Sequence, residues 1–393
     1  MAFQKITSIG FGGRLKNALG GTVFGVLMFI AGTMLLFWNE GNFVKTKKSI
    51  QEAGTALVSV RDVSSLDPAL DGKLIHASAF ADTQDTLTDG LFGVSEKAIS
   101  LSRKVEYYQY KEHSRTETKD KIGGGQERVV TYTYTQEWVP DPVNSGSFED
   151  PSYRSSNFVL TRLDDKREYA ANVSFGGYKL PSFIISSIRG NVPADVKLTG
   201  QELQRWEDEV SKNMAALGLS RDTQMVHVQG NEVYLGKSPS NPAIGDVRVT
   251  LAKIVPADIS IIAKVYGNTF ETFTASNGRS FSSVAMGLVS ADAMIEGAKS
   301  TNKVITWILR IIGIILVIVG LKGMFGILPA LFKVLPFLGS IVDAGLGLVC
   351  FIGGASWSLL VISISWLLYR PLIGIPMVVI AVAGTVFLKL RGK

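Results

Sequence analysis

The chain offers few side chains that could carry out chemistry, and those it has are isolated from one another. Its three histidines, His76, His113 and His227, have no second histidine or cysteine at the spacing of a metal site. Cys350 is the single cysteine, which excludes an intrachain disulfide and a two-cysteine redox site. The sequence also has no G-x-S-x-G or phosphate-binding loop pattern. We therefore expect no catalytic residue, no cofactor and no metal site.

The more informative charges are those that interrupt apolar runs. Arg310 lies within the run Val304–Leu321, and Asp343 lies near the start of the run Ile341–Tyr369. A charge at the bilayer centre costs about 2.5–3.5 kcal/mol on insertion scales, so such residues are usually paired, interior or snorkelling. At about 1.5 Å per residue, the two charges differ in depth by roughly 12 Å. A direct Arg310–Asp343 pair is one alternative. The other is an Arg310 that snorkels, caps carbonyl groups or binds an acid of a neighbour.

Four apolar runs are long enough to cross a bilayer, which needs about 20 apolar residues per helix. The first, Ala18–Trp38, has no small-residue cleavage site after it, so we interpret it as an uncleaved anchor and not as a signal peptide. The segment 323–340 contains two prolines and is expected to lie at the interface or to re-enter, with a fifth crossing as the alternative. The predicted division is a cytoplasmic N-terminal segment (1–17), a first transmembrane helix (18–38), an extramembrane domain (39–302), a second helix (303–321), a cytoplasmic interfacial or re-entrant segment (322–340), a third helix (341–369), a fourth helix (370–388) and a cytoplasmic tail (389–393).

The net charge of +6 divides along the same boundaries. Residues 39–302 carry 29 Lys and Arg against 33 Asp and Glu, a net of −4, and the rest carries 11 against one, a net of +10. The basic character therefore belongs to the membrane segments, and a nucleic-acid partner has no support. Because Lys and Arg accumulate in cytoplasmic loops, both termini are expected inside and the domain outside. The residues that set this orientation are Lys5, Arg14, Lys16, Lys322, Lys333, Lys389, Arg391 and Lys393, with Trp38, Trp307 and Trp366 near the outer ends of their helices.

The extramembrane domain is predicted to be α+β and rich in strands. Thr199–Gly218 has the pattern of an amphipathic helix, with a capping box formed by Thr199 and Glu202. The absence of a regular β–α alternation favours antiparallel pairing, and Gly123–Gly125 marks a turn between two aromatic strands. The predicted strands are Ala56–Val60, Lys73–Phe80, Lys104–Tyr110, Arg128–Val139, Val247–Ile254 and Ile259–Tyr266.

Small residues recur along the apolar runs. Gly21 and Gly25 form a G-x-x-x-G pair in the first run, with Gly32 one heptad further on, and Gly313 and Gly320 do the same in the second. Such stripes let helix backbones approach closely, so a packed bundle is expected. The partner helix belongs either to the same chain or to another copy.

Several short motifs, taken in order, give the chain its resemblance to the transmembrane protein 43 (LUMA) family. The resemblance covers nearly the whole chain. The motifs are Phe37-Trp38-Asn39-Glu40-Gly41, Gly72-Lys73-Leu74-Ile75-His76, Gly245-Asp246-Val247-Arg248-Val249, Thr306-Trp307-x-x-Arg310 and Trp366-Leu367-x-Tyr369-Arg370-Pro371-Leu372.

The resemblance implies four spans, a large non-cytosolic domain, homo-oligomerisation and no catalytic activity. Animal members are inner-nuclear-membrane and ER proteins that associate with lamina and emerin-type partners. The compact chain resembles a bacterial member, which would place it in the bacterial inner membrane with a periplasmic domain, the ER or inner nuclear membrane being the alternative.

Two motifs also have a direct physical interpretation. Asn39 and Gly41 are expected to end the first helix by satisfying its terminal carbonyl groups and by adopting a positive φ, which favours a structural over a binding role for Glu40. Arg370 and Pro371 are expected to form a tight outer hairpin. Arg310, inside another motif, is the preferred candidate for a contact that holds the bundle together.

The sequence therefore predicts a non-enzymatic, oligomeric membrane scaffold, in contact with the lipid bilayer and with membrane or envelope proteins. One alternative is an envelope sensor that binds a ligand through residues 39–302. The other is a channel or transporter, which would need a continuous polar path.

Overall fold

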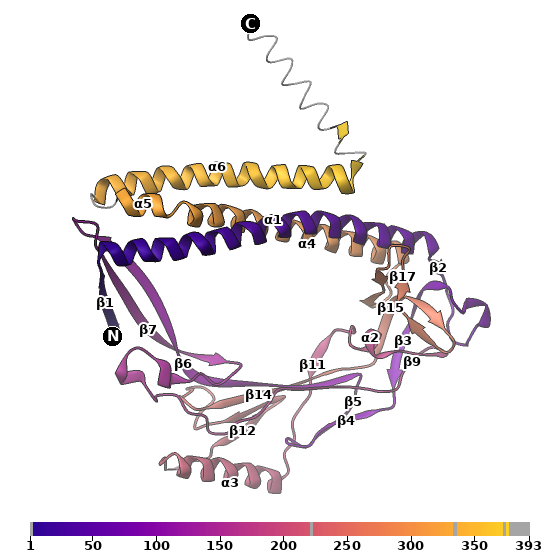
Figure 1. The fold of residues 1–393 in the computed structure, drawn as a ribbon. Helices are drawn as coiled ribbons and strands as arrows, with labels where there is room; N and C mark the ends of the chain where they lie inside the picture. The colour runs from indigo at the N-terminus through magenta and orange to yellow at the C-terminus, as the bar shows by residue number, and fades with distance from the viewer. Residues whose placement is uncertain (1–2, 221–222, 333–335, 372–374, 377–393) are drawn as a thin grey trace.

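A computed structural model describes residues 3–220, 223–332, 336–371 and 375–376, and the side chains of all of these except 336–340. Long helices lie side by side along one side of a strand-rich domain (Figure 1). The expected fourth helix (370–388) lies largely, and the tail (389–393) wholly, outside the described residues. The helices of this layer are α1 (Phe11–Ala56), α4 (Ala291–Met324), α5 (Ile327–Phe332) and α6 (Pro336–Tyr369).

Three helical segments of the described chain are long and apolar enough to cross a membrane. They are Phe11–Ala56, Ala291–Phe332 and Ile341–Tyr369. Helix α1 is much longer than the predicted first span, because it continues for 18 residues after Trp38 and reaches about 69 Å at 1.5 Å per residue. The interfacial or re-entrant segment predicted at 322–340 contains the end of α4, the short helix α5 and the start of α6.

Helices α1 and α4 pack backbone against backbone through their glycines. A Cβ atom on Gly25 would lie 2.7 Å from the carbonyl oxygen of Gly320, and one on Gly32 would lie 2.9 Å from that of Gly313. Neither position has room for a side chain, so the small residues permit the close approach. The partner of the predicted glycine stripe is thus a helix of the same chain.

The larger sheet has its core at the end of the domain farthest from the bundle (Figure 1). Its antiparallel strand order is β1-β7-β6-β14-β13-β12, with β8 and β11 paired to β6 and β14. Strand β14 coincides with a predicted strand, whereas β6 is longer than predicted at both ends. The strands are β1 (Phe3–Ile9), β6 (Ser100–Asp120), β7 (Gln126–Val139), β8 (Lys166–Tyr169), β11 (Asn191–Pro193), β12 (Val226–Gln229), β13 (Glu232–Leu235) and β14 (Val247–Ile254).

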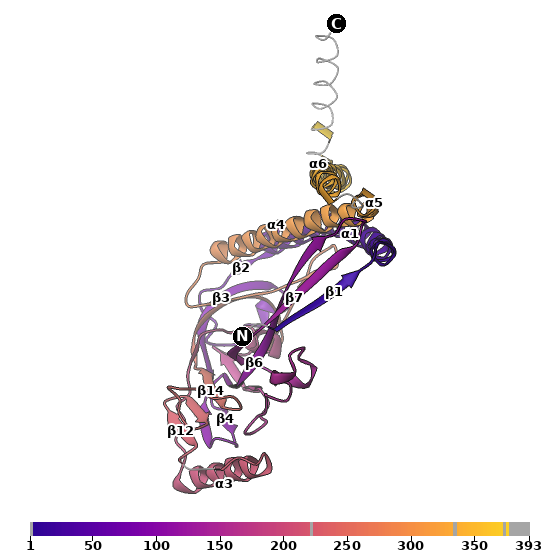
Figure 2. The ribbon, with the colours of Figure 1, turned by 90° about the vertical axis from the view of Figure 1, so that its left-hand side faces the viewer.

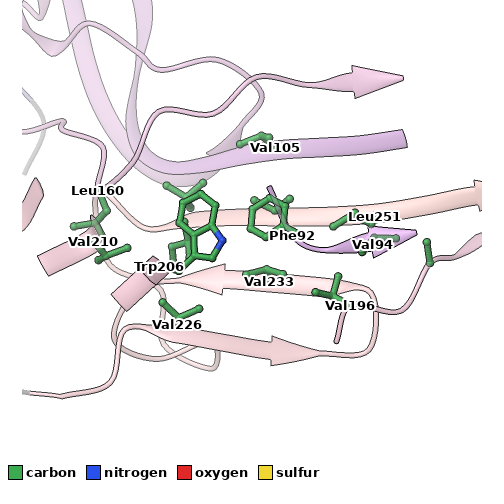
Figure 3. Close-up of a cluster of buried hydrophobic side chains, with 14 of the residues drawn as sticks. Phe92, Val94, Val105, Leu160, Val196, Trp206, Val210, Val226, Val233 and Leu251 are labelled. Atoms are coloured by element: carbon green, nitrogen blue, oxygen red, sulfur yellow. The ribbon is translucent and has the colours of Figure 1, made fainter. Parts of the chain in front are cut away.

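Helix α3 (Gly200–Ala216) closes the core of this sheet. The predicted capping box is present, since the Thr199 hydroxyl accepts from the amide of Glu202 at 3.3 Å and the Glu202 carboxylate accepts from the amide of Thr199 at 2.8 Å. Trp206 is buried and stacks on Phe92 with ring centroids 5.0 Å apart. Figure 3 shows these two rings among valine and leucine side chains from the sheet, from α3 and from neighbouring segments.

The second sheet lies next to the bundle and has its own core. Its order is β10-β9-β3-β15-β16, with β19 on β15 and β2 on β3, the last pair being parallel. Two further pairs, β4–β5 and β17–β18, stand apart from both sheets. The elements are β2 (Val58–Ser59), β3 (Leu74–Thr83), β4 (Thr86–Asp89), β5 (Val94–Lys97), β9 (Val173–Phe175), β10 (Tyr178–Lys179), α2 (Ser182–Ile185), β15 (Ala257–Tyr266), β16 (Thr269–Glu271), β17 (Phe273–Thr274), β18 (Ser280–Phe281) and β19 (Ser283–Met286).

The N-terminal segment differs from the prediction. Strand β1 pairs with β7 along its whole length, from Phe3 opposite Tyr132 to Ile9 opposite Gln126. Together with the outer halves of β6 and β7 it forms an arm, residues 3–9 and 111–135, that reaches the start of α1 (Figures 1 and 2). The segment 1–17 was expected across the membrane from residues 39–302, yet its first strand pairs with β7 and extends their sheet.

Ion pairs fasten this strand to the domain. Lys5 binds Glu149 at 2.9 Å, and Arg14, almost buried at the start of α1, binds Asp120 at the end of β6 at 2.7 Å. Two of the three cations that predicted a cytoplasmic N-terminus are therefore neutralised by acids of the sheet domain. These two cations therefore give less support to a cytoplasmic N-terminus.

The other end of α1 is clamped by the β17–β18 hairpin. Arg279 donates to Asn42 and to Thr46, both at 2.7 Å, and the Asn277 side chain donates to the carbonyl of Lys45 at 2.8 Å. The second half of α1 also packs Ile50 and Ala53 into an apolar joint with α4 and the second sheet. These contacts explain why the helix continues past the membrane boundary that the sequence predicted.

Strand pairing between β1 and β7 can be tested by disulfide crosslinking in native membranes. In a Cys350→Ser background, Ser8→Cys and Glu127→Cys face each other directly, and opposed Cβ atoms in such pairs lie about 4.5–5.5 Å apart. We expect rapid crosslinking under mild oxidation. Thr135→Cys in place of Glu127→Cys is the control, since it lies about 26 Å further along β7 and should not react with Ser8→Cys. Labelling of the two introduced thiols from opposite membrane faces, without crosslinking, would show that α1 separates the strands.

Candidate functional site

The carboxylate of Glu40 is the centre of a buried site between α1, α4 and the end of α6. Its Oε1 accepts from Arg310 Nε at 2.6 Å, and its Oε2 accepts from Arg310 Nη2 at 2.9 Å. Oε2 also accepts from Trp366 Nε1 at 2.8 Å and from Arg370 Nη2 at 3.3 Å. The residue is 0% exposed. One carboxylate thus receives four hydrogen bonds from two other helices.

Aromatic rings hold the two arginines in place. The Arg310 guanidinium lies 4.9 Å from the ring centroid of Trp307 and 5.9 Å from that of Trp366. The Arg370 guanidinium lies 4.3 Å from the ring of Phe43. Rings at this distance stabilise a cation that has lost its water, and the bidentate Arg310–Glu40 geometry fixes the angle between α1 and α4. With two arginines and one glutamate, the site keeps a formal charge of +1.

Asn39 and Asn302 add reciprocal contacts on either side of Glu40. The Asn39 side chain donates to the carbonyl of Thr306 on α4 at 3.0 Å, and the Asn302 side chain donates to the carbonyl of Phe43 on α1 at 3.1 Å. Each helix therefore supplies an amide to the backbone of the other. Away from water such bonds hold two helices together side by side.

The predicted role of Asn39 and Gly41 as a helix terminus is wrong. Gly41 is not among the glycines with positive φ, and α1 continues through it to Ala56. Its hydrogen side chain instead makes space for the ring of Tyr369, which a Cβ atom would approach to 2.7 Å. The motif resembles a helix end in sequence, but its small and polar residues serve contacts between helices.

Arg310 does not pair with Asp343. Its acid is Glu40, and Asp343 lies 3.6 Å from Lys322, with both of those side chains at least 40% exposed. The depth difference of roughly 12 Å estimated from the sequence is the physical reason. Glu40 was predicted to have a structural role but was not matched to Arg310, because it lies just past the predicted end of the first span, where an acid has water to solvate it.

The structure brings most of the predicted site residues to this one place and leaves some out. Trp38 lies on the outer surface and is 56% exposed. Gly25 serves the α1–α4 contact, whereas a Cβ atom on Gly21 would meet no other atom within 4 Å. Pro371 follows Arg370 beside α1, where both line a cavity. The residues that gather around the carboxylate are Asn39, Glu40, Gly41, Trp307, Arg310 and Arg370.

A second buried acid belongs to the Gly245–Val249 motif of the sheet domain. The Asp246 carboxylate accepts from the Tyr234 hydroxyl and from the amide of Ala243 at 2.8 Å, and it is 3% exposed. Burial raises the pKa of Asp246 above its usual range, and these hydrogen bonds offset only part of that effect. Arg248, next but one, stacks on Trp138 at 4.4 Å and binds Glu106 at 2.8 Å.

The histidines lie apart from one another in the fold. His76 lies on β3 and contacts the carbonyl of Val289, His113 lies on the arm, and His227 lies on β12 at the edge of the larger sheet. Within the described residues, no three His, Cys, Asp or Glu side chains come close enough together to hold a metal ion.

Loss of the Glu40 charge should destabilise the bundle strongly. Glu40→Gln leaves two guanidinium groups, on side chains that are only 11% and 19% exposed, with no counter-charge. Breaking a buried pair typically costs about 3–5 kcal/mol. We expect a large drop in the thermal unfolding midpoint of the protein in mild detergent. Glu40→Gln with Arg310→Met restores the original charge of +1 and should recover part of that drop.

The matched control is Asp343→Asn, which removes an acid from an exposed pair and should cost less than about 1 kcal/mol. Equal effects of Glu40→Gln and Asp343→Asn would contradict a structural role for the Glu40 centre.

The raised pKa of Asp246 predicts that the stability of the folded protein depends on pH. Because its pKa is raised in the folded protein, the folded state holds the proton more tightly, and stability falls as pH rises above about 4, the unfolded value. Asp246→Asn keeps an acceptor for Tyr234 and Ala243 without the charge, so it should unfold at the same or a higher temperature at pH 7 and lose that advantage near pH 4. Asp246→Ala removes the acceptor and should cost about 1–3 kcal/mol. A lower unfolding temperature for Asp246→Asn than for Asp246→Ala would refute this account.

Comparison with known proteins assigns the chain to a family. Residues 107–371 match the family described as Transmembrane protein 43. The chain is 28% identical to the human protein of that name over 397 residues, which cover 96% of this chain and 92% of the human one. It is 25% identical to the homolog from Drosophila melanogaster over 362 residues, covering 90% and 89%. No solved structure matches the chain.

These relatives are animal proteins, so the comparisons do not support the expected bacterial source. Three of the five motifs that gave the chain its resemblance meet at Glu40, which is bonded by residues of the Trp307–Arg310 and Trp366–Pro371 segments. The family match covers more than half of the chain, and the similarity to the human protein covers nearly all of it, so this chain belongs to the transmembrane protein 43 family.

Proposed function

We propose that this protein is a non-enzymatic membrane scaffold, in which a rigid helix bundle carries a sheet domain that binds other proteins. One observation carries the proposal: the polar side chains of Asn39, Glu40 and Asn302 join the membrane helices to one another. Glu40 is fully buried beneath Arg310, Trp366 and Arg370. A carboxylate closed off in this way is suited to hold an architecture, and it is inaccessible to a substrate.

The arm is the surface best suited to bind a partner. Strand β1 is the outermost strand of its sheet within the described residues, so one of its edges keeps unpaired backbone groups. Ile6 on that strand is 63% exposed, and Ile122 at the arm's tip is 88% exposed. An open strand edge with exposed apolar side chains is a template for strand addition by another chain.

We infer that the sheet domain lies outside the cytosol. Lys322 near the end of α4, and in the sequence Lys333 and the basic residues 389–393, support this orientation through the excess of Lys and Arg in cytoplasmic loops. The N-terminus no longer adds independent support, because Lys5 and Arg14 pair with acids of the domain. The endoplasmic reticulum and the nuclear envelope are the membranes that suit an animal-like family member.

Homo-oligomerisation belongs to the same proposal. The glycine stripes give it no support, since they are used between α1 and α4 of one chain. Support comes from the wide apolar surface that the described helices leave uncovered, where Val23, Met34 and Ile311 are each more than half exposed. Lipid covers such a surface in a monomer, and a second copy covers part of it in an oligomer.

A sensor function has one observation in its favour. A cleft of about 390 Å³ opens between β3, β9 and β10, and its polar lining includes Asp82, Asn172, Lys179 and Asn268. A small polar ligand bound there should raise the thermal unfolding temperature of the protein. A channel function gains no such support from the described residues, because α1 and α4 touch through their backbones at Gly25 and Gly32.

The scaffold proposal predicts crosslinks from the arm. A photoreactive amino acid at Ile122 should form a discrete crosslink to a second copy or to a partner protein in native membranes. The same probe at Leu217, which is 45% exposed at the end of α3, is the control and should give none. The protein is also expected to self-associate in lipid nanodiscs, measured by mass photometry. A strictly monomeric protein with no arm-specific crosslink would rule the proposal out.

A further inference from the structure

A cavity of about 410 Å³ lies beside the Glu40 centre, in the groove between α1 and the end of α6. It has a basic side and an apolar side, and no acidic side chain lines it among the described residues. The lining residues are Val44, Lys47, Lys48 and Gln51 from α1, and Tyr369, Arg370 and Pro371 from the end of α6.

The cavity and the centre together carry more positive than negative charge. The net charge is +3, because the one negative side chain, Glu40, is outnumbered by four positive ones: Lys47, Lys48, Arg310 and Arg370. Lys47 and Lys48 are exposed and form no ion pair with any described residue. The centre therefore leaves a positive charge that an anion in the cavity would balance.

Arg370 links the two features. Its guanidinium has five N–H donors, of which one bonds Glu40 at 3.3 Å. Its face is covered by the Phe43 ring at 4.3 Å, so the remaining donors point along the plane of the guanidinium. An arginine held flat by a ring and partly satisfied by a carboxylate is well placed to bind a second oxyanion, such as a phosphate.

The depth of the cavity matches that of lipid headgroups. Counting from Trp38, the last residue of the uncharged run, Glu40 is about 3 Å and Lys47 about 14 Å further along α1. The polar zone of a bilayer begins where the hydrocarbon ends, and lysine side chains reach back toward it. A phosphate held by Lys47, Lys48 and Arg370 would thus lie at the height of the phospholipid phosphates.

An apolar cavity lies directly deeper in the same groove. It measures about 380 Å³ and is lined by Thr33, Met34 and Phe37 of α1 and by Val361 and Ile364 of α6. Phe37 and Tyr369, one from each cavity, are in ring contact at 5.7 Å. On α1, Thr33, Phe37, Val44 and Lys47 fall on one face at 100° per residue. A basic cavity above an apolar one matches the two chemical parts of a phospholipid.

We propose that the groove between α1 and the end of α6 binds an anionic phospholipid, with its phosphate held by Lys47, Lys48 and Arg370 and an acyl chain against the apolar cavity below. The bound lipid balances the excess positive charge of the Glu40 centre. It also ties the end of α6 to the part of α1 that the sheet domain clamps.

The test uses the full-length protein, delipidated in mild detergent and then titrated with phosphatidylglycerol, with bound lipid counted by native mass spectrometry. Wild type should hold one phosphatidylglycerol tightly, and Lys47→Gln with Lys48→Gln should weaken it at least tenfold. The matched control is Lys45→Gln with Lys303→Gln, which removes two exposed charges at the same end of the bundle outside the cavity and should change the affinity less than twofold.

A second experiment distinguishes a lipid ligand from free phosphate. Inorganic phosphate at the same concentration should not raise the thermal unfolding temperature of the delipidated protein, whereas phosphatidylglycerol should raise it in wild type and control but not in Lys47→Gln with Lys48→Gln. Equal lipid binding by all three proteins would overturn the proposal in favour of nonspecific annular lipid. Equal stabilisation by inorganic phosphate would overturn it in favour of a soluble phosphate ligand.

Discussion

The structure depends on one carboxylate that is removed from water and must be fully satisfied. Glu40 receives both donors of an arginine fork, an indole N–H and a second arginine, and these come from helices that are far apart in sequence. An isolated buried charge is unstable in a membrane environment, so the three helices must arrive together for the carboxylate to be tolerated. The packing of Gly25 and Gly32 brings α1 and α4 close, and the Glu40 centre then fixes which end of α6 joins them.

The same centre couples the membrane helices to the sheet domain. Glu40 and the residues that the β17–β18 hairpin holds, Asn42 and Thr46, are within two turns of one helix. The contacts of Glu40 and those of the hairpin are therefore held on one continuous helix, α1. The apolar joint around Ile50 and Met294 reinforces the connection. The domain is carried by the bundle as a rigid attachment at this end.

Features that depend on local sequence were predicted well. Helix α3 followed from the Thr199–Glu202 capping box and the spacing of Trp206 and Val210, and strand β14 followed from its alternation. The long apolar runs gave the helices that can cross a membrane, because length and apolar composition are sufficient for that inference. Arg310 stood out since a charge in such a run needs a partner.

Features that depend on distant partners were predicted poorly. The partner of Arg310 is 270 positions away, and Asn39-Glu40-Gly41 has the composition of a helix end, so the continuation of α1 was missed. Asn302 and Arg279 gave no signal, because single polar residues in polar segments are common. Strand β1 was missed because Lys5, with Arg14 and Lys16 soon after it, suggested a cytoplasmic N-terminal segment. Lys5 and Arg14 in fact form ion pairs with Glu149 and Asp120, which lie over 100 positions later in the sequence.

The order of the Glu40 contacts along the chain has a consequence for biosynthesis. Protein chains are made from the N-terminus, so α1 exists for the time needed to add 270 residues before Arg310 is available to it. During that interval the carboxylate has none of its final partners, and Trp366 and Arg370 follow later still. A truncated or stalled chain would end with this acid exposed at the edge of the lipid. In the completed chain the Glu40 carboxylate is buried. Exposure of this one side chain therefore distinguishes an unfinished molecule from a finished one.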